Sequence, residues 1–321
     1  MNIKLISKKI LILWLVIASA TTAFPLSLAD YPLIPVPQEI RLGKNSFLVK
    51  EACIDMPEWR DAWTQTINDC GIVATPLAEF RIKGRIVSEI PGAPSGNDEA
   101  YRLCIGKKGI NVDAVSAQGI YWALQTLRQI AMADGGRLPE CEVTDWPAFP
   151  WRGFMIDTGR SYVSLDELKR EISMMSRFKL NVFHWHLTDN QAWRLESRIY
   201  PMLNDSVNME RDHGRYYTLA EARELVRFAK AHNVLLLPEI DMPGHSAAFE
   251  RTFGHDMQSQ EGMAILRQLV DEVCAAFDVP YLHIGTDEVR FTNPDFVPEM
   301  VRFVREKGKK VVSWNPGWNY K

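Results

Sequence analysis

The sequence predicts an α/β protein: a parallel sheet of the (β/α)8 TIM-barrel type, preceded by an α+β domain. Three observations predict this fold. From residue 153 onward, short apolar runs alternate with segments of helical periodicity. The runs are apolar almost throughout, as in strands buried on both faces of a parallel sheet. Polar side chains follow the end of each run, where the reactive groups of such sheets collect.

The N-terminal residues 1–29 have the pattern of a secretory signal peptide. Three lysines precede the apolar run 10–20, and Ser-Leu-Ala at 27–29 offers a cleavage site between small residues. We therefore expect a secreted or periplasmic protein with no membrane span after cleavage. The alternative is an uncleaved membrane anchor, because residues 10–29 carry no charge and are long enough to span a bilayer.

Charge and cysteine content exclude two further classes. With 37 Lys and Arg against 40 Asp and Glu, the net charge of −3 gives no basic footprint for nucleic acid. The five cysteines are odd in number, widely separated and without zinc-type spacing. We expect most of them to be small buried residues, while one disulfide stays an open alternative. They are Cys53, Cys70, Cys104, Cys141 and Cys274.

Residues 30–147 are predicted to form the α+β accessory domain. Three prolines in segment 31–37 exclude a helix there. Segments 101–105 and 110–112 are predicted to be paired strands. A helix should follow, with apolar residues spaced four, three and four apart, before the glycines at 135–136 end it. These helix positions are Ile120, Leu124, Leu127 and Ala131. No residue of this domain carries recognisable chemistry.

Residues 148–321 are predicted to contain five parallel strands and the helices between them. Two capping boxes, 164–167 and 218–221, open the first two helices. Two further helices are expected at 262–277 and 300–307. The predicted strands are 153–157, 180–186, 234–240, 281–285 and 310–314.

A doubly wound sheet is the alternative to a barrel, and two features favour the barrel. No nucleotide-binding glycine motif follows a strand. Chemistry-bearing residues follow all five strands, whereas a doubly wound sheet gathers its site at one switch point. The connection 187–217 is long enough to contribute to an active site.

Asp287 and Glu288 are the strongest catalytic candidates. They lie where a short buried strand ends, so at least one of them must lie on the loop. Neighbouring acids repel, which favours a protonated partner beside an ionised one. Acid-assisted cleavage of a glycosidic bond needs such a pair.

A metal-dependent hydrolase is the mechanistic alternative. His184 and His186 share one strand face by the two-residue period and could hold a metal. Further ligands would be His245, His283 and Asp287. In the other interpretation, these histidines orient carboxylates and line a polar pocket whose tryptophans suit the apolar face of a sugar.

Four segments resemble, in order, motifs of glycoside hydrolase family 20, the β-N-acetylhexosaminidases. They are RGFMIDTGR (152–160), NVFHWHLTD (181–189), PEIDMPGH (238–245) and HIGTDE (283–288). Residues 30–146 are similar to the accessory N-terminal domain of that family. Two positions depart from the family pattern. Thr286 stands where a second glycine is usual, and Asn190 stands where a second acid usually follows Asp189.

The resemblance implies an exo-acting, retaining hydrolase of terminal non-reducing N-acetyl-β-hexosamine residues in glycans, without cofactor or metal. It implies substrate-assisted catalysis through an oxazolinium intermediate. Glu288 would be the acid and base, and Asp287 would orient the acetamide group. Asp189 and His245 would form a relay that tunes the pKa of Glu288.

The resemblance also implies that Arg160 holds the 3- and 4-hydroxyls of the terminal sugar and that Trp314 forms a wall of the acetamide pocket. His186 is expected to support these residues from behind. The segment from Trp151 to Lys321 is shorter than the roughly 250 residues of a typical barrel. We therefore expect an incomplete barrel that is inactive by itself; a sugar-binding protein without catalysis is the alternative.

Overall fold

The computed structural model describes residues 31–133 and 136–314, and the chain divides into two compact units between Trp146 and Pro147. The predicted signal peptide lies outside the described residues. Within those two ranges, no helix is both long enough and apolar enough to cross a membrane. All five cysteines are free thiols.

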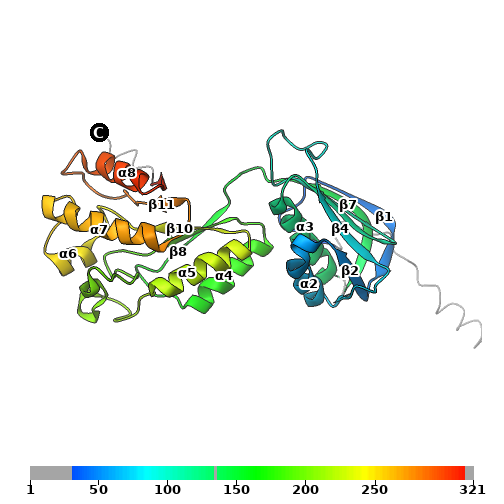
Figure 1. Ribbon diagram of the computed structural model, residues 1–321, viewed down its shortest axis with the longest axis horizontal. Helices are drawn as coiled ribbons and strands as arrows, with labels where there is room; N and C mark the ends of the chain where they lie inside the picture. The colour runs from blue at the N-terminus through cyan, green and yellow to red at the C-terminus, as the bar shows by residue number, and fades with distance from the viewer. Residues whose placement is uncertain (1–30, 134–135, 315–321) are drawn as a thin grey trace, which may run out of the picture. The chain divides into compact units, whose positions relative to one another are not determined.

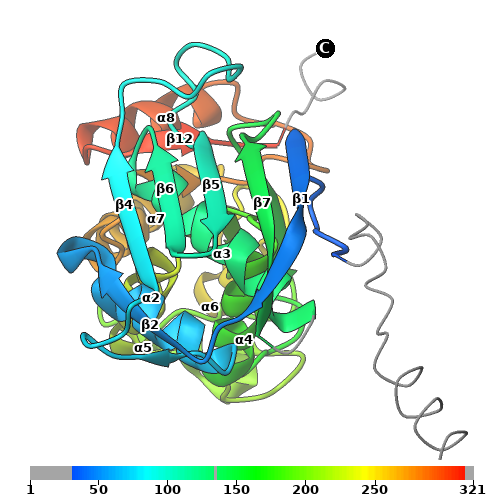
Figure 2. The same ribbon diagram turned by 90° about the vertical axis from the view of Figure 1, so that its right-hand side faces the viewer.

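Unit 1 is built on a seven-stranded mixed sheet (Figure 2) with the order β1-β7-β5-β6-β4-β2-β3. The predicted strand pair is confirmed as the antiparallel neighbours β5 and β6. The strands are β1 (Glu39–Leu48), β2 (Glu51–Asp55), β3 (Val73–Ala74), β4 (Arg81–Ile86), β5 (Tyr101–Gly106), β6 (Gly109–Ala114) and β7 (Arg137–Asp145).

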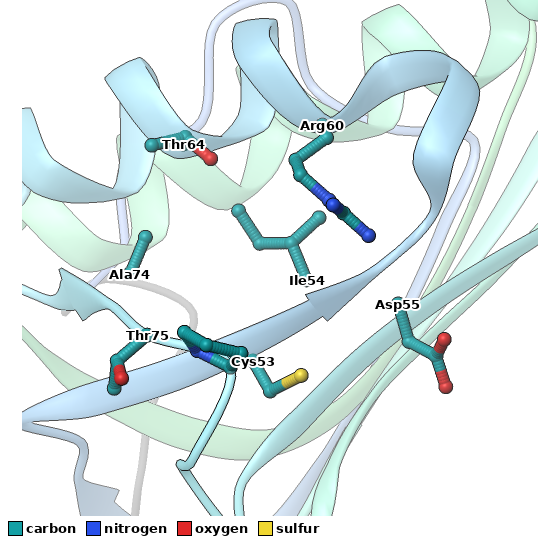
Figure 3. A pocket seen from close by; sticks show the side chains of 8 residues that line it. Cys53, Ile54, Asp55, Arg60, Thr64, Ala74 and Thr75 are labelled. Atoms are coloured by element: carbon teal, nitrogen blue, oxygen red, sulfur yellow. The ribbon is translucent and has the colours of Figure 1, made fainter.

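Helices α2 (Arg60–Asp69) and α3 (Ala117–Ala133) pack against this sheet. The four apolar positions predicted for α3 are all buried in the core of unit 1. A pocket of about 230 Å³ lies beside β2 and α2 (Figure 3), where Arg60 and Thr64 come from the helix and Cys53 from the strand. Asp55 is its one lining carboxylate, so the pocket does not offer the paired acids of a glycosidase.

Unit 2 contains a five-stranded sheet with the order β12-β11-β10-β9-β8, and every neighbouring pair is parallel. All five predicted strands are confirmed. Their spatial order follows their sequence order without a switch point, which is the arrangement of a barrel and not of a doubly wound sheet. The strands are β8 (Gly153–Asp157), β9 (Val182–His186), β10 (Leu235–Glu239), β11 (Tyr281–His283) and β12 (Lys310–Val312).

The helices of unit 2 follow the strands in turn. Helices α4, α5, α7 and α8 lie side by side in that order (Figure 1), as in the outer layer of a barrel. Both predicted capping boxes are formed, at Ser164–Glu167 and Thr218–Glu221. The helices are α4 (Leu165–Arg177), α5 (Leu219–Ala231), α6 (Ala247–Phe253), α7 (Gln260–Ala276) and α8 (Phe296–Glu306).

Two details differ from the prediction. Helix α8 begins at Phe296, before the predicted start at Met300, because Pro298 is tolerated in the first turn, where its missing N–H has no intrahelical acceptor. The short helix α6 after β10 was not predicted. The long connection after β9 contains two 3-10 helices, Pro201–Asn204 and Ser206–Asn208. It is held by the fully buried Arg194, which donates to backbone carbonyls within the connection.

Candidate active site

Polar side chains at the carboxyl ends of the strands form one row. The register pairs Asp157 of β8 with His186 of β9. It pairs Glu239 of β10 with His186 on one side and with His283 of β11 on the other. Four neighbouring strands therefore place an ionisable residue at the same level of the sheet, at the edge where parallel barrels carry their active sites.

His186 is buried between two carboxylates. Its Nε2 lies 2.9 Å from Oδ2 of Asp189, and its Nδ1 lies 2.8 Å from Oε2 of Glu239. Burial alone would lower the pKa of His186, but the hydrogen bonds to Asp189 and Glu239 raise that pKa to about 10. His186 is therefore a buried cation at neutral pH. Burial opposes ionisation of Asp189 as well, yet hydrogen bonds from His186 and His245 hold the pKa of Asp189 well below its usual range.

His245 joins Asp189 to the acidic pair. Its Nδ1 lies 3.6 Å from Oδ1 of Asp189, and its Nε2 lies 3.4 Å from Glu288 and 3.9 Å from Asp287. The hydrogen bond with Asp189 outweighs the effect of burial and raises the pKa of His245 to about 8. The structure thus brings together the three residues of the expected relay from Asp189 through His245 to Glu288.

The two adjacent acids lie in different environments. The side chain of Glu288 is 71% exposed, so it can reach a leaving group and water. The side chain of Asp287 is 34% exposed, and its Oδ1 atom is buried with no hydrogen-bond partner among residues 31–133 and 136–314. Asp287 therefore offers an acceptor that a bound ligand can satisfy, since an unpaired buried oxygen is costly.

The loop that carries these acids packs tightly against the end of β10. Gly285 adopts φ 64°, and a side chain there would collide with the carboxylate of Asp241. Thr286 is fully buried at φ 85°, a conformation that β-branched residues rarely adopt. Its N–H lies 3.3 Å from Oδ1 of Asp241. The departure noted at Thr286 is thus accommodated by a strained backbone.

Asp241 is buried beside two other carboxylates. Burial, followed by the negative charges of Glu239 and Asp287, raises the pKa of Asp241 to about 8. Its Oδ2 atom has no hydrogen-bond partner in the part of the chain that the structure describes. Burial and its anionic neighbours therefore favour the protonated form of Asp241, which relieves repulsion around Asp287.

Arg160 and Trp314 border the site. The guanidinium group of Arg160 lies 2.6 Å from Asp157 and 3.0 Å from Asp189, and 43% of its side chain stays exposed to a ligand. The indole N–H of Trp314 donates to Glu239 at 2.9 Å. The structure therefore brings all seven predicted site residues to one end of the sheet.

Three of the four histidines of the metal alternative surround the carboxylate of Glu239, and the fourth, His245, lies apart from them beside Asp189. Each possible metal-binding set among the described residues contains at most two of the five candidates. In the set formed by His184, Glu239 and His283, the carboxylate oxygens lie 2.7 and 3.0 Å from the two imidazoles. At these distances both imidazoles lie directly against the carboxylate, which occupies the space between them, as the other interpretation expects.

Two residues that shape the site were not among those predicted. Glu239 and Asp241 are both fully buried at the end of β10. Their signal in the sequence is two acids one residue apart at the end of an apolar strand. One strand face would then carry both towards the sheet's reactive edge. The sequence alone gave no register by which to place Glu239 between histidines.

The fold and this arrangement define an enzyme-type site at the carboxyl face of a (β/α) barrel. Comparison with family models gives two matches: "Glycosyl hydrolase family 20, domain 2" at residues 30–146 and "Glycosyl hydrolase family 20, catalytic domain" at residues 149–261. The chain belongs to glycosyl hydrolase family 20. The catalytic-domain match includes Arg160, Asp189 and His245, while the acidic pair lies beyond its end.

Known proteins agree with this membership. The chain is 31% identical to a beta-hexosaminidase of Porphyromonas gingivalis, across 80% of this chain and 38% of that protein. It is 34% identical to a beta-N-acetylhexosaminidase of Cellulomonas fimi, across 69% and 51%. The chain thus spans about half or less of these relatives. The solved Streptomyces coelicolor beta-N-acetylhexosaminidase is 26% identical with a TM-score of 0.75, covering 91% of this chain and 67% of that one.

Proposed function

We propose that the protein is an exo-acting β-N-acetylhexosaminidase that removes terminal non-reducing N-acetyl-β-hexosamine residues from glycans by a retaining, substrate-assisted mechanism. The observation that carries this proposal is the acidic pair. Oδ1 of Asp287 is buried and has no hydrogen-bond partner among the described residues, and Glu288 lies beside His245. A mutant of a Streptomyces plicatus beta-hexosaminidase, 28% identical to this chain, has been solved in complex with product, GlcNAc, which supports the sugar class.

In the proposed reaction, the 2-acetamido oxygen of the substrate attacks the anomeric carbon while Glu288 donates a proton to the departing oxygen. The acetamide N–H donates to Asp287, whose negative charge offsets the positive charge that develops on the oxazolinium ring. Glu288, now a carboxylate, takes a proton from the water that opens the ring. Two successive displacements at one carbon retain its configuration.

The test is release of 4-nitrophenol from its N-acetyl-β-glucosaminide, with and without a chelator. Because the matched relatives are longer than this chain, we would assay the chain alongside a fusion in which the remaining barrel segment of the Streptomyces coelicolor relative follows Trp314. Hydrolysis that resists the chelator and is strongly reduced in Asp287→Asn supports the proposal. Loss of turnover on chelation would favour the metal-dependent alternative, and binding of N-acetylglucosamine without turnover by a folded fusion would favour a sugar-binding protein.

We also propose a secreted or periplasmic location. The support is the pattern of residues 1–29, which lies outside the described part of the chain. N-terminal sequencing of the mature protein is expected to begin at Asp30, and an intact Met1 in a membrane fraction would favour the uncleaved anchor.

A further inference from the structure

Glu239 connects two sides of the site through one buried carboxylate. It is fully buried, and each oxygen contacts two side-chain nitrogens. Its Oε2 lies 2.7 Å from His184 and 2.8 Å from His186. Its Oε1 lies 3.0 Å from His283 and 2.9 Å from Trp314. His186 and Trp314 make the well-formed hydrogen bonds, since Nδ1 of His283 accepts the N–H of Gly285 and Nε2 of His184 lies outside hydrogen-bond geometry. Burial favours protonation of Glu239, but its three histidine neighbours hold its pKa well below the usual range, so the carboxylate is ionised.

One side leads to the proton donor of the proposed reaction. From Glu239 the contacts run through His186 and Asp189 to His245 and Glu288. Anionic and cationic groups alternate along this path. Loss of the negative charge at its buried end should therefore lower the pKa of His186 and weaken the support that His186 receives opposite Asp189.

The other side leads to the proposed wall of the acetamide pocket. The ring of Trp314 is fixed by its bond to Glu239. The backbone N–H of Trp314 donates to Gly285, and its carbonyl lies 3.4 Å from the hydroxyl of Thr286. The indole and the loop that carries Asp287 are thus held as one unit.

We propose that Glu239 is a positioning residue that couples the orientation of Trp314 to the chain of contacts ending at Glu288. The proposal rests on the function proposed above, in which Trp314 forms a wall of the acetamide pocket and Glu288 is the proton donor. Because His186 and Trp314 share this carboxylate, a change at one should be felt at the other. Loss of the indole hydrogen bond should strengthen the attraction between Glu239 and His186. Loss of the negative charge should weaken the contacts of Glu239 with both His186 and Trp314.

Both histidines of this path, His186 and His245, have several charged neighbours. His186 faces Glu239, Asp189 and, at 4.0 Å, Asp157. His245 faces Asp189, Asp287 and Glu288, and the guanidinium of Arg160 lies 3.3 Å from its Nδ1. Asp241 acts on His245 as well.

Glu239→Gln is the direct test, and Glu99→Gln is its matched control. Glu99 is a buried glutamate of unit 1 that also accepts an indole N–H, from Trp122 at 2.6 Å. The readout is NMR of the imidazole nitrogens, which reports the ionisation of His186 without need of turnover. In Glu239→Gln, His186 is expected to titrate about one pH unit or more lower, because one of its anionic partners is lost. Glu99→Gln should leave this titration unchanged.

A second readout is enzyme kinetics, measured with whichever of the chain and the fusion described above hydrolyses the aryl glycoside. Glu239→Gln should shift the basic limb of the kcat/KM profile and raise KM for the N-acetylated aryl glycoside, since both the relay and the Trp314 wall are disturbed. Glu239→Asp, which keeps the charge, should restore the His186 titration. A variant that loses only thermal stability, with His186 titration and pH profile unchanged, overturns the proposal.

Trp314→Phe tests the coupling even if Glu239→Gln does not fold. It keeps a ring but removes the N–H that neutralises part of the Glu239 charge, so His186 should titrate higher. An unchanged His186 titration in Trp314→Phe overturns the coupling. Failure of the hydrolase proposal is separate: the wild type would then show no turnover, while the NMR shifts would still occur.

Discussion

Nε2 of His245 lies 3.4 Å from Oε2 of Glu288. The other nitrogen of the same ring faces Asp189, so one imidazole joins a buried carboxylate to an exposed one. In the proposed reaction Glu288 first donates and then accepts a proton. Both steps benefit from the neighbouring His245, whose charge is stabilised by Asp189. The ionisation of His245 is therefore a property on which both stability and chemistry depend.

Stability should fall as pH rises through the titration of His245. Its pKa is raised in the folded protein to about 8, from 6.5. The resulting stabilisation, about 2 kcal/mol, is complete below pH 6.5 and is lost as pH rises through about 8. Urea unfolding between pH 6 and 9 measures it, and His245→Gln should flatten this part of the curve.

Asp241 should also make the stability of the folded protein fall as pH rises. Because its folded pKa is raised to about 8, the folded state binds a proton that the unfolded state releases from about pH 4 upward. Asp241→Asn, which imitates the protonated acid, should therefore be more stable than the wild type at pH 8. If Asp241→Asn and the wild type kept parallel curves from pH 4 to 8, the assigned ionisation would be wrong.

Glu288→Gln should discriminate between leaving groups. Its exposed carboxyl is the proposed proton donor, and loss of a general acid costs about 10²–10⁴-fold in rate. Substrates with poor leaving groups, such as N-acetyl-β-hexosamine disaccharides, should suffer this loss in full, while activated aryl glycosides should be spared in part. Glu261→Gln, on the exposed start of α7, serves as control. Equal losses on both substrate types would contradict the acid role.

Asp287→Asn should damage both substrate types alike. The acetamide must be oriented whatever the leaving group, and the unpartnered Oδ1 of Asp287 is the proposed acceptor for its N–H. Loss of one such charged interaction costs on the order of 10²-fold in kcat. The measurement is kcat across a series of aryl leaving groups, where the loss should be constant. Near-normal rates in this variant would mean that the acetamide does not take part in the reaction.

Local patterns predicted the parts of the fold that local physics determines. The five strands of unit 2 followed from apolar runs, and the capping boxes at Ser164 and Thr218 followed from side chains that bond three residues away. The position of Glu239 between histidines did not follow, because it depends on the register of three strands that are far apart in sequence. Helix α8 starts at Phe296 and not at the predicted residue 300, because Pro298 is tolerated in the first helical turn.

The site residues divide in the same way. Asp287 and Glu288 could be identified as an adjacent pair, and the relay residues came from the family resemblance. What the sequence did not provide is which carboxylate would be protonated. That depends on burial and neighbouring charge: burial and the anions Glu239 and Asp287 dominate at Asp241, whereas hydrogen bonds from His186 and His245 dominate at Asp189.

Thr286→Gly should stabilise the protein. Thr286 is β-branched at φ 85°, and holding a side chain in the left-handed region costs about 1–2 kcal/mol. Glycine removes this strain and loses about 0.5–1 kcal/mol through the freedom of the unfolded chain, so a net gain of up to about 1.5 kcal/mol is expected. The control is Asn233→Gly, at φ 54° beyond the end of α5, where asparagine is tolerated and the change should stay within a few tenths of a kcal/mol.

Urea denaturation measures both variants, with an unchanged slope and a higher midpoint expected for Thr286→Gly. A lower midpoint for Thr286→Gly than for Asn233→Gly would show that the contacts of the threonine side chain, including its hydroxyl beside the Trp314 carbonyl, outweigh the strain.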